Sequence, residues 1–280
     1  MFNAIIRSAV LISVLSLFGG CGNSTGDTDS ERADSLLLQA KQFFSEGNDS
    51  MSLVMLDSLD HSAAKAINQR KEARLLRPQV VERMAMTRLS EADSMMVVNQ
   101  IKGEHLRNEL EFVSGTGVEG YYVGRGTRSV DVRSVAGLHS RVSPDYHFYL
   151  IASSTQPIGS VSVELISGNE SVRSVSVGFD GERNTRNSAC ETITFTEAES
   201  HPLGEFVARH ANDPIKIIFI GESGRNVPMD LNDIQKKAIL STFGLIDAVN
   251  ADRYYRLEKD RLTRQVEIAR KQLANVAAKE

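Results

Sequence analysis

Residues 113–117 read Val-Ser-Gly-Thr-Gly, and the spacing of the apolar residues changes at this point from a helical period to alternation. Before it, apolar residues recur every three or four positions. After it, they alternate with Ser, Arg and Glu as far as residue 229, and from residue 230 the helical period returns. The sequence therefore predicts an α+β protein in which a β domain is inserted between two helical segments.

The inserted domain, residues 113–229, is expected to be an antiparallel β-sandwich or roll. Val161, Val163 and Leu165 alternate with polar residues, so each sheet should bury one face only. Asp180 and Gly181 are typical of a hairpin turn, and residues 202–210 are expected to form a short helix. The predicted strands are residues 120–123, 129–135, 146–152, 159–166, 172–179, 191–196 and 215–220.

The helical segment before it, residues 32–112, is expected to form a helical hairpin or bundle. Gly47 marks the first turn, and Pro78 predicts a break or kink. Residues 40–57 resemble one helix pair of the tetratricopeptide type, but no second copy follows near residue 74. A solenoid is therefore not expected, since repeats are stable only when they stack.

Residues 230–280 are expected to form one long C-terminal helix, with Asp230 as its N-cap. A helix of this length would have an apolar seam that a compact domain cannot cover, because each residue adds about 1.5 Å. One partner for the seam is the helix over residues 78–112, against which the C-terminal helix would pack as a coiled-coil-like stalk. The other is a second copy of the same helix in a homo-oligomer, and the spacing does not separate the two.

Overall composition excludes several classes of protein. The 280 residues include 32 Lys and Arg against 36 Asp and Glu, so the net charge is −4, which argues against a nucleic-acid partner. The apolar run over residues 8–18 is too short to span a bilayer and is typical of a signal peptide. Residues 1–20 are therefore predicted to be a signal peptide, and the Gly-, Ser- and Asp-rich residues 21–31 a flexible tether.

The end of that signal peptide reads Leu17, Phe18, Gly19, Gly20 and Cys21. It resembles the lipobox of bacterial lipoproteins, apart from Phe18, where the family usually has Leu, Val or Ile. The resemblance implies that Cys21 carries a diacylglyceryl group and an N-acyl chain such as palmitate, and that these chains anchor the protein to a membrane.

Residues after the cysteine bear on the membrane concerned. Gly22 replaces the Asp that favours inner-membrane retention in proteobacterial lipoproteins, so the resemblance implies the outer membrane, on its periplasmic or surface side. Asp27, Asp29 and Glu31 weakly resemble the surface-export signal of lipoproteins from Bacteroides-type bacteria, or are simply part of a polar tether. The Leu-Asp-Ser-Leu motif at residues 56–59 extends the resemblance to envelope lipoproteins of that group, which implies a compartment and no activity.

No catalytic centre, cofactor or metal site is predicted. The six His stand singly, without the spacing of zinc ligands, and no phosphate-binding loop or nucleophile elbow is present. Cys190 is expected to be a buried small hydrophobic residue. The one plausible ligand-binding cluster consists of tyrosines, namely Tyr121, Tyr122, Tyr146 and Tyr149.

Three functions are consistent with these features. The first is a non-catalytic, lipid-anchored envelope protein that contacts a protein partner or a second copy through its helices. The second is a lipoprotein that binds a glycan or a peptide through the tyrosines, or in a groove between the β domain and the long helices. The third is a hydrolase whose catalytic residues are dispersed along the sequence.

Overall fold

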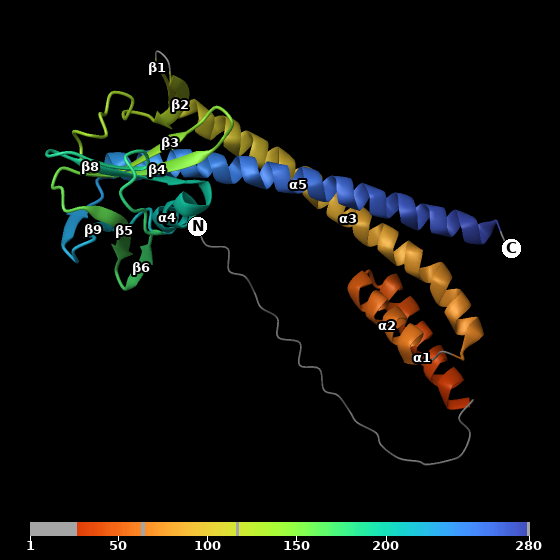
Figure 1. Ribbon diagram of the computed structural model, residues 1–280. Coiled ribbons are helices and arrows are strands. Elements are labelled where there is room, and N and C mark those ends of the chain that lie inside the picture. Colours follow the sequence, from red (N-terminus) through yellow and green to blue (C-terminus); the bar gives the residue numbers. More distant parts are fainter. Residues whose placement is uncertain (1–26, 63–64, 116–117, 279–280) are drawn as a thin grey trace. The chain divides into compact units, whose positions relative to one another are not determined.

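The computed structural model describes residues 27–62, 65–115 and 118–278 (Figure 1). The predicted signal peptide and the lipobox cysteine lie outside these residues. The chain divides into two compact units, residues 1–84 with 267–280 and residues 85–266. The helices are α1 (Asp27–Ser45), α2 (Asp49–Ser62), α3 (Ile67–Asn108), α4 (Glu197–Arg209) and α5 (Asp233–Ala277), of which α3 and α5 belong partly to each unit.

The first unit contains the predicted helical hairpin. Gly47, with φ +79°, forms the turn between α1 and α2, in a conformation that glycine adopts without steric cost. Arg83 of α3 stabilises this turn, because its guanidinium pairs with Asp49 and lies 3.8 Å from the centre of the Phe44 ring. The core of the unit is made of small and aliphatic side chains: Ala33, Leu37, Ala40, Leu56, Leu59, Ala66, Ala73, Leu76 and Val80.

The second unit contains two antiparallel sheets, as the alternating pattern predicts. One sheet has six strands in the order β1-β2-β3-β4-β8-β7, and the other has four in the order β10-β9-β5-β6. The strands of the first sheet are β1 (Leu110–Gly115), β2 (Val118–Gly124), β3 (Gly137–Val142), β4 (Phe148–Ser154), β7 (Asn184–Arg186) and β8 (Glu191–Thr196). Those of the second are β5 (Ser160–Ser167), β6 (Glu170–Arg173), β9 (Lys216–Gly221) and β10 (Asn226–Asp230).

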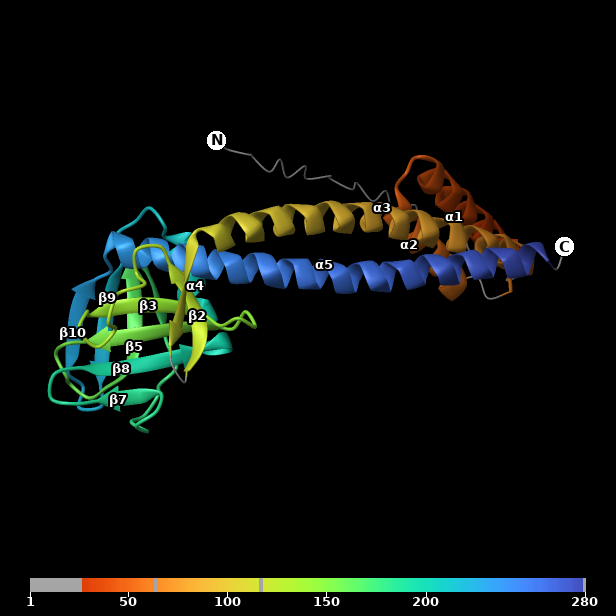
Figure 2. The ribbon, with the colours of Figure 1, turned by 90° about the horizontal axis from the view of Figure 1, so that it is seen from above.

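The two sheets share one apolar core. Phe195 of β8, Phe206 of α4 and Phe219 of β9 are each at most 1% exposed, so both sheets and α4 contribute to it. Phe243 and Ile239 add the first turns of α5. Figure 2 shows the strands of the two sheets crossing steeply, as in orthogonal sheet packing. Burial of each large side chain contributes about 1.5–3 kcal/mol.

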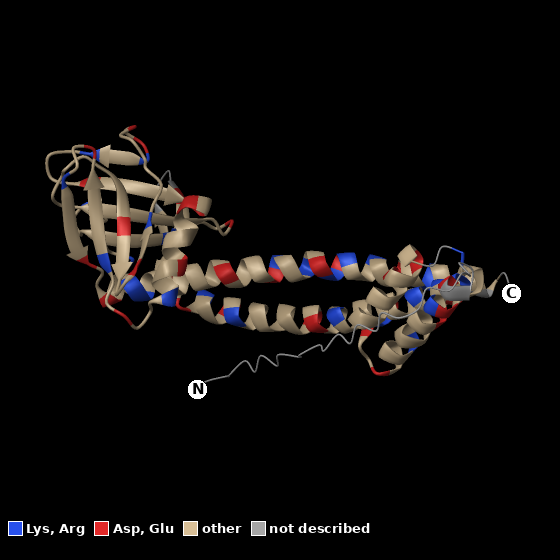
Figure 3. Cartoon of the chain, turned by 90° about the horizontal axis from the view of Figure 1, so that it is seen from below, with Lys and Arg blue, Asp and Glu red and all other residues tan. Residues whose placement is uncertain are grey.

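Within the second unit, α5 packs against α3 in antiparallel orientation. Lys102 pairs with Asp247 at 2.8 Å, and Asp93 pairs with Lys259 at 2.7 Å. Acidic and basic residues are interspersed along both helices (Figure 3), as expected for solvated outer faces. Of the two partners that the sequence allows for the apolar seam of α5, the structure shows α3 of the same chain.

Two predicted strands are wrong in whole or part. Residues 129–135 form turns, because the Asp131 carboxylate accepts hydrogen bonds from the Arg133 N–H at 3.0 Å and the Ser134 hydroxyl at 2.7 Å. The strand expected over 172–179 ends at Arg173. Beyond it, the Ser174 hydroxyl oxygen accepts a hydrogen bond from the Val163 N–H at 3.0 Å, where a regular strand would offer a backbone carbonyl oxygen. The sequence pattern predicts no strand at the positions of β1, β3, β7 and β10.

Several predicted helix boundaries also differ from the structure. Pro78 does not break α3, which continues through it to Asn108. Asp230 is the last residue of β10, and the cap of α5 is Asn232, whose Oδ1 accepts the Gln235 N–H at 2.8 Å. Residues 27–31, predicted as tether, belong to α1, since acidic side chains such as Asp29 are favourable in a first turn. Among the described residues no helix is long and apolar enough to cross a membrane.

Candidate ligand-binding groove

The four tyrosines predicted as a cluster lie on two faces of the six-stranded sheet. Tyr121 points to the outer face, where the Arg141 guanidinium lies 4.2 Å from its ring centre. Arg141 is the cross-strand neighbour of Tyr149, which therefore shares that face. Tyr122 and Tyr146 pack against the core on the other side. The structure thus forms two pairs of tyrosines rather than one cluster.

Arg107 joins the second pair. Its guanidinium donates hydrogen bonds to the hydroxyl oxygens of Tyr122, at 2.9 Å, and of Tyr146. It also lies over both rings, 5.2 Å from the centre of Tyr122 and 5.9 Å from that of Tyr146. Cation–π contacts of this kind contribute about 0.5–1 kcal/mol at exposed sites. The end of α3 is thereby fixed to the hairpin between β3 and β4.

Two adjoining pockets open on either side of Tyr146, and together they are called the Tyr146 groove. Tyr146 and Arg253 belong to the walls of both pockets. The α4 pocket has a volume of about 330 Å³ and the α3 pocket one of about 440 Å³, within the range of small-molecule sites. The α4 pocket is lined by Tyr146, His147, Phe148, Glu197, Ala198, His201, Ile246, Asn250 and Arg253. The α3 pocket is lined by Asn99, Gln100, Gly103, Glu104, Arg107, Tyr146, Leu245, Ala248, Val249, Asp252, Arg253 and Arg256.

A tight hairpin turn presents Tyr146 to this groove. The Tyr146 N–H donates to the Ser143 carbonyl oxygen at 3.0 Å, and the Ser143 N–H donates to the His147 carbonyl oxygen at 3.0 Å. Pro144 suits the second position of such a turn because its φ is fixed near −65°. Tyr146 follows this turn and has φ +67°, which is the αL conformation that glycine or asparagine usually adopts at such a position. The sequence keeps a large aromatic side chain where the backbone disfavours it.

Glu197 is strained in the same way. It has φ +33°, and among the described residues Tyr146 and Glu197 are the two non-glycine residues with positive φ. Both line the α4 pocket, where the Glu197 carboxylate pairs with the His147 ring. Each such conformation costs about 1–3 kcal/mol, and strain of this kind clusters at functional sites. The backbone thus marks the α4 pocket as a candidate site independently of its volume.

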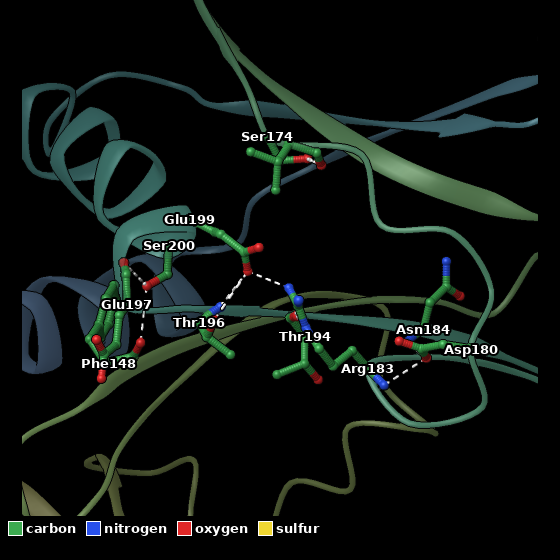
Figure 4. Close-up of polar contacts among 11 residues, drawn as sticks. Phe148, Ser174, Asp180, Arg183, Asn184, Thr194, Thr196, Glu197, Glu199 and Ser200 are labelled. Carbon is green, nitrogen blue, oxygen red and sulfur yellow. Dashed lines mark hydrogen bonds and ion pairs between the residues drawn. The ribbon is translucent and has the colours of Figure 1, made fainter.

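A polar network holds the start of α4 in place beside Glu197 (Figure 4). The Glu199 carboxylate accepts hydrogen bonds from the Arg183 guanidinium and, at 3.1 Å, from the Thr196 N–H. The Arg183 contact is the main cause that lowers the pKa of Glu199, and Glu199 in turn raises the pKa of Arg183. The Ser200 hydroxyl donates to the Phe148 carbonyl oxygen at 3.0 Å, which ties α4 to β4.

The turn that carries Arg183 is itself fixed by a carboxylate. Asp180 Oδ1 accepts the backbone N–H groups of Glu182, Arg183 and Asn184, each at 2.9 Å. These bonds, with that of Asn184 the largest contribution, lower the pKa of Asp180. The turn at Asp180 thus positions Arg183 against α4. It is not the predicted hairpin turn, because the strands on either side of it, β6 and β7, belong to different sheets.

A much smaller pocket lies beneath the loop over residues 125–136, on the outer face of the sheet. Its volume is about 20 Å³, enough for about one water molecule. Tyr121 and His139 are among its lining residues, and burial lowers the pKa of His139. Its size excludes an organic ligand, so Tyr121 is not placed to bind one there.

The Tyr146 groove combines arginines, carboxylates, imidazoles, a tyrosine hydroxyl and aliphatic surface. Among the described residues, no group of three His, Cys, Asp or Glu side chains is placed to hold a metal ion. Of its polar residues, the sequence had singled out Tyr146 alone. Arg107, Glu197 and Arg253 come from distant parts of the chain and carry no motif. No protein-family model, curated protein or solved structure matches this chain.

Proposed function

We propose that this protein is a non-catalytic lipoprotein of the cell envelope, anchored to the outer membrane through lipid on Cys21, and that it binds a ligand in the Tyr146 groove. The observation that carries the binding proposal is that the two strained non-glycine residues, Tyr146 and Glu197, line one pocket. The sequence of residues 17–21 supports the anchor. Strain maintained beside an open pocket is consistent with selection for binding at the expense of stability.

A blocking variant tests the binding proposal. Asn250 is exposed on α5 and lines the α4 pocket, so Asn250→Trp should fill that pocket without entering the core. Asp260→Trp, at an exposed position of the same helix outside both pockets, is the matched control. In a thermal-shift screen of peptides, glycans and small organic acids, at least one compound class should raise the Tm of the wild type and of Asp260→Trp but not that of Asn250→Trp. If every stabilising compound acts equally on all three proteins, the groove is not the binding site.

The anchor has its own test. Cys21→Ala should move the protein from the membrane fraction to the soluble fraction, because a lipidated protein depends on its acyl chains for stable attachment. Mature wild-type protein should also show the mass of the acyl chains. Retention of Cys21→Ala at the membrane would contradict the lipid anchor and leave the groove proposal intact.

A second candidate function is contact with a protein partner or a second copy through the helices. It is favoured by an apolar strip on α3, where Val97, Val98 and Ile101 are 54%, 54% and 63% exposed. If the strip is an interface between copies, Ile101→Glu should convert an oligomer into a monomer in analytical ultracentrifugation. A wild-type chain that is already monomeric at high concentration would exclude self-association through this strip.

A further inference from the structure

We infer that the ligand of the Tyr146 groove carries a carboxylate attached to an aliphatic segment, and that Arg253 binds the carboxylate. This inference rests on the proposed function and goes beyond it by assigning the chemical class of the ligand. It starts from the charges around the groove and from which of them are paired within the protein.

Two acidic groups of the groove contact neighbouring side chains. The Glu197 carboxylate contacts the His147 ring, and Asp252 pairs with Arg256 at 2.6 Å. Asp252 also accepts a hydrogen bond from Gln100 at 3.1 Å. These carboxylates therefore have partners before any ligand enters.

The cationic groups are less completely paired. Arg107 is held by two tyrosine hydroxyls, and no carboxylate in the described part of the chain pairs with it. Arg253 has no ion pair or hydrogen bond to any other residue that the structure describes, although it lies in the walls of both pockets. Glu104, on the α3 side of the groove, is the acidic residue opposing them. An anionic ligand group is consequently favoured at the Arg253 side of the groove, next to Tyr146.

The rest of the α3 pocket determines what the carboxylate is attached to. Leu245, Ala248 and Val249 form an aliphatic wall on α5, and Gly103 faces them from α3. Tyr146 is the aromatic residue among the described lining residues of the α3 pocket, and the Arg107 guanidinium lies over its ring, so the apolar surface of this pocket is mainly aliphatic. An arginine beside an aliphatic wall matches the C-terminal residue of a short peptide or the head of a fatty acid, and both offer an aliphatic carboxylate.

Matched acids and amides test the assignment directly. The probes are acetyl-Ala-Leu with a free carboxylate, its C-terminal amide, and octanoate, measured by isothermal titration calorimetry. At least one of the two acids should bind the wild type. If the peptide acid binds, it should bind about 10- to 100-fold more tightly than the amide, since a charge-assisted hydrogen bond is lost in the amide. Preference for octanoate over the peptide acid would assign a fatty acid as the source of the carboxylate, and the reverse would assign a peptide end.

Arg253→Gln identifies the residue responsible. It should weaken binding of the acids by about 10- to 100-fold and leave the amide unchanged, so that peptide acid and amide bind equally. Arg264→Gln, at an exposed position of the same helix outside both pockets, should behave as the wild type. Tyr146→Asn, which fits the αL backbone but removes the ring from the walls of both pockets, should also weaken binding of the acids.

Three results would overturn the assignment. The first is equal binding of peptide acid and amide to the wild type, and the second is no binding of either acid. The third is an Arg253→Gln variant that retains full affinity for the acids. If neutral compounds nevertheless stabilise the wild type but not Asn250→Trp, the groove is a binding site and the carboxylate assignment alone has failed.

Discussion

Replacing Glu191 by alanine should lower the free energy of unfolding of the second unit by about 2–6 kcal/mol, because this carboxylate satisfies four buried donors. Glu191 is 2% exposed at the start of β8. Its Oε2 accepts the N–H groups of Ile158 at 3.2 Å, Gly159 at 2.9 Å and Ser160 at 3.1 Å, and its Oε1 accepts the Ser160 hydroxyl. Glu191 therefore connects the six-stranded sheet to the first residue of β5 in the other sheet.

The magnitude follows from the number of donors left without an acceptor. Alanine at position 191 removes both oxygens, and a water molecule that fills the vacated space can accept from about two donors. Two donors then remain buried and unpaired, at about 1–3 kcal/mol each. Glu191→Gln keeps an acceptor oxygen but loses the charge, so its cost should be smaller, about 1–2 kcal/mol.

Equilibrium urea unfolding, followed by circular dichroism, measures both variants. Glu191→Ala should have a lower midpoint at an unchanged slope, and its Tm should fall by at least about 4 °C for a unit of this size. Glu182→Ala, which removes an exposed carboxylate from a neighbouring turn, is the control and should change little. If Glu191→Ala costs less than about 1 kcal/mol, the donors are satisfied without the carboxylate and the reasoning is refuted.

Three further predictions concern pH and packing. A carboxylate whose pKa is lowered by folding adds stability that is complete above its unfolded pKa and is lost as the pH falls. Arg183→Met, which removes the main contact of Glu199, should therefore lower the free energy of unfolding by about 0.5–1 kcal/mol more at pH 7 than near pH 3 in urea titrations. Burial lowers the pKa of His139 below its usual 6.5, so the unfolded chain binds the extra proton and the wild type should lose Tm as the pH falls below about 6.5, more steeply than His139→Gln. Gly124→Ala should lower Tm by several degrees, because the new Cβ would lie 2.4 Å from the Cα of Ala238 in α5.

Where one face of an element is buried, the sequence pattern predicts it well. The strand expected over residues 159–166 corresponds closely to β5, whose buried Val163 and Leu165 alternate with partly exposed residues. The helical period likewise predicts α5, since its seam against α3 recurs with the spacing of a packed helix. In both cases the burial that stabilises the element also imposes the pattern.

Prediction fails where a side chain replaces the backbone as a hydrogen-bond partner. Val130 and Val132 alternate as in a strand, yet the Asp131 carboxylate binds the next turn and the chain forms a loop. Ser174 ends the regular pairing of β6 in the same manner. Apolar spacing carries no information on such contacts, because one carboxylate or hydroxyl suffices to satisfy a backbone group.

The candidate groove could be predicted only in part for a different reason. Tyr146 is a candidate from the sequence because it is one of four tyrosines in the β region. Charged residues such as Arg107, Glu197 and Arg253 resemble ordinary solvated residues in the sequence. They converge because the β strands are inserted between α3 and α5, so that the end of α3, the β3–β4 hairpin, the start of α4 and the middle of α5 meet at one place.

That convergence also explains why the strain at Tyr146 persists. The αL position of the hairpin would favour glycine or asparagine, but Arg107 donates a hydrogen bond to the Tyr146 hydroxyl and lies over its ring, offsetting part of the backbone cost. Tyr146→Phe removes the hydroxyl and with it the hydrogen bond from Arg107. The free energy of unfolding of this variant should therefore be lower than that of the wild type. A hairpin whose least favourable residue is held by the end of α3 couples the shape of the groove to the packing of α3 on α5, and residues at that seam can alter binding without touching a ligand.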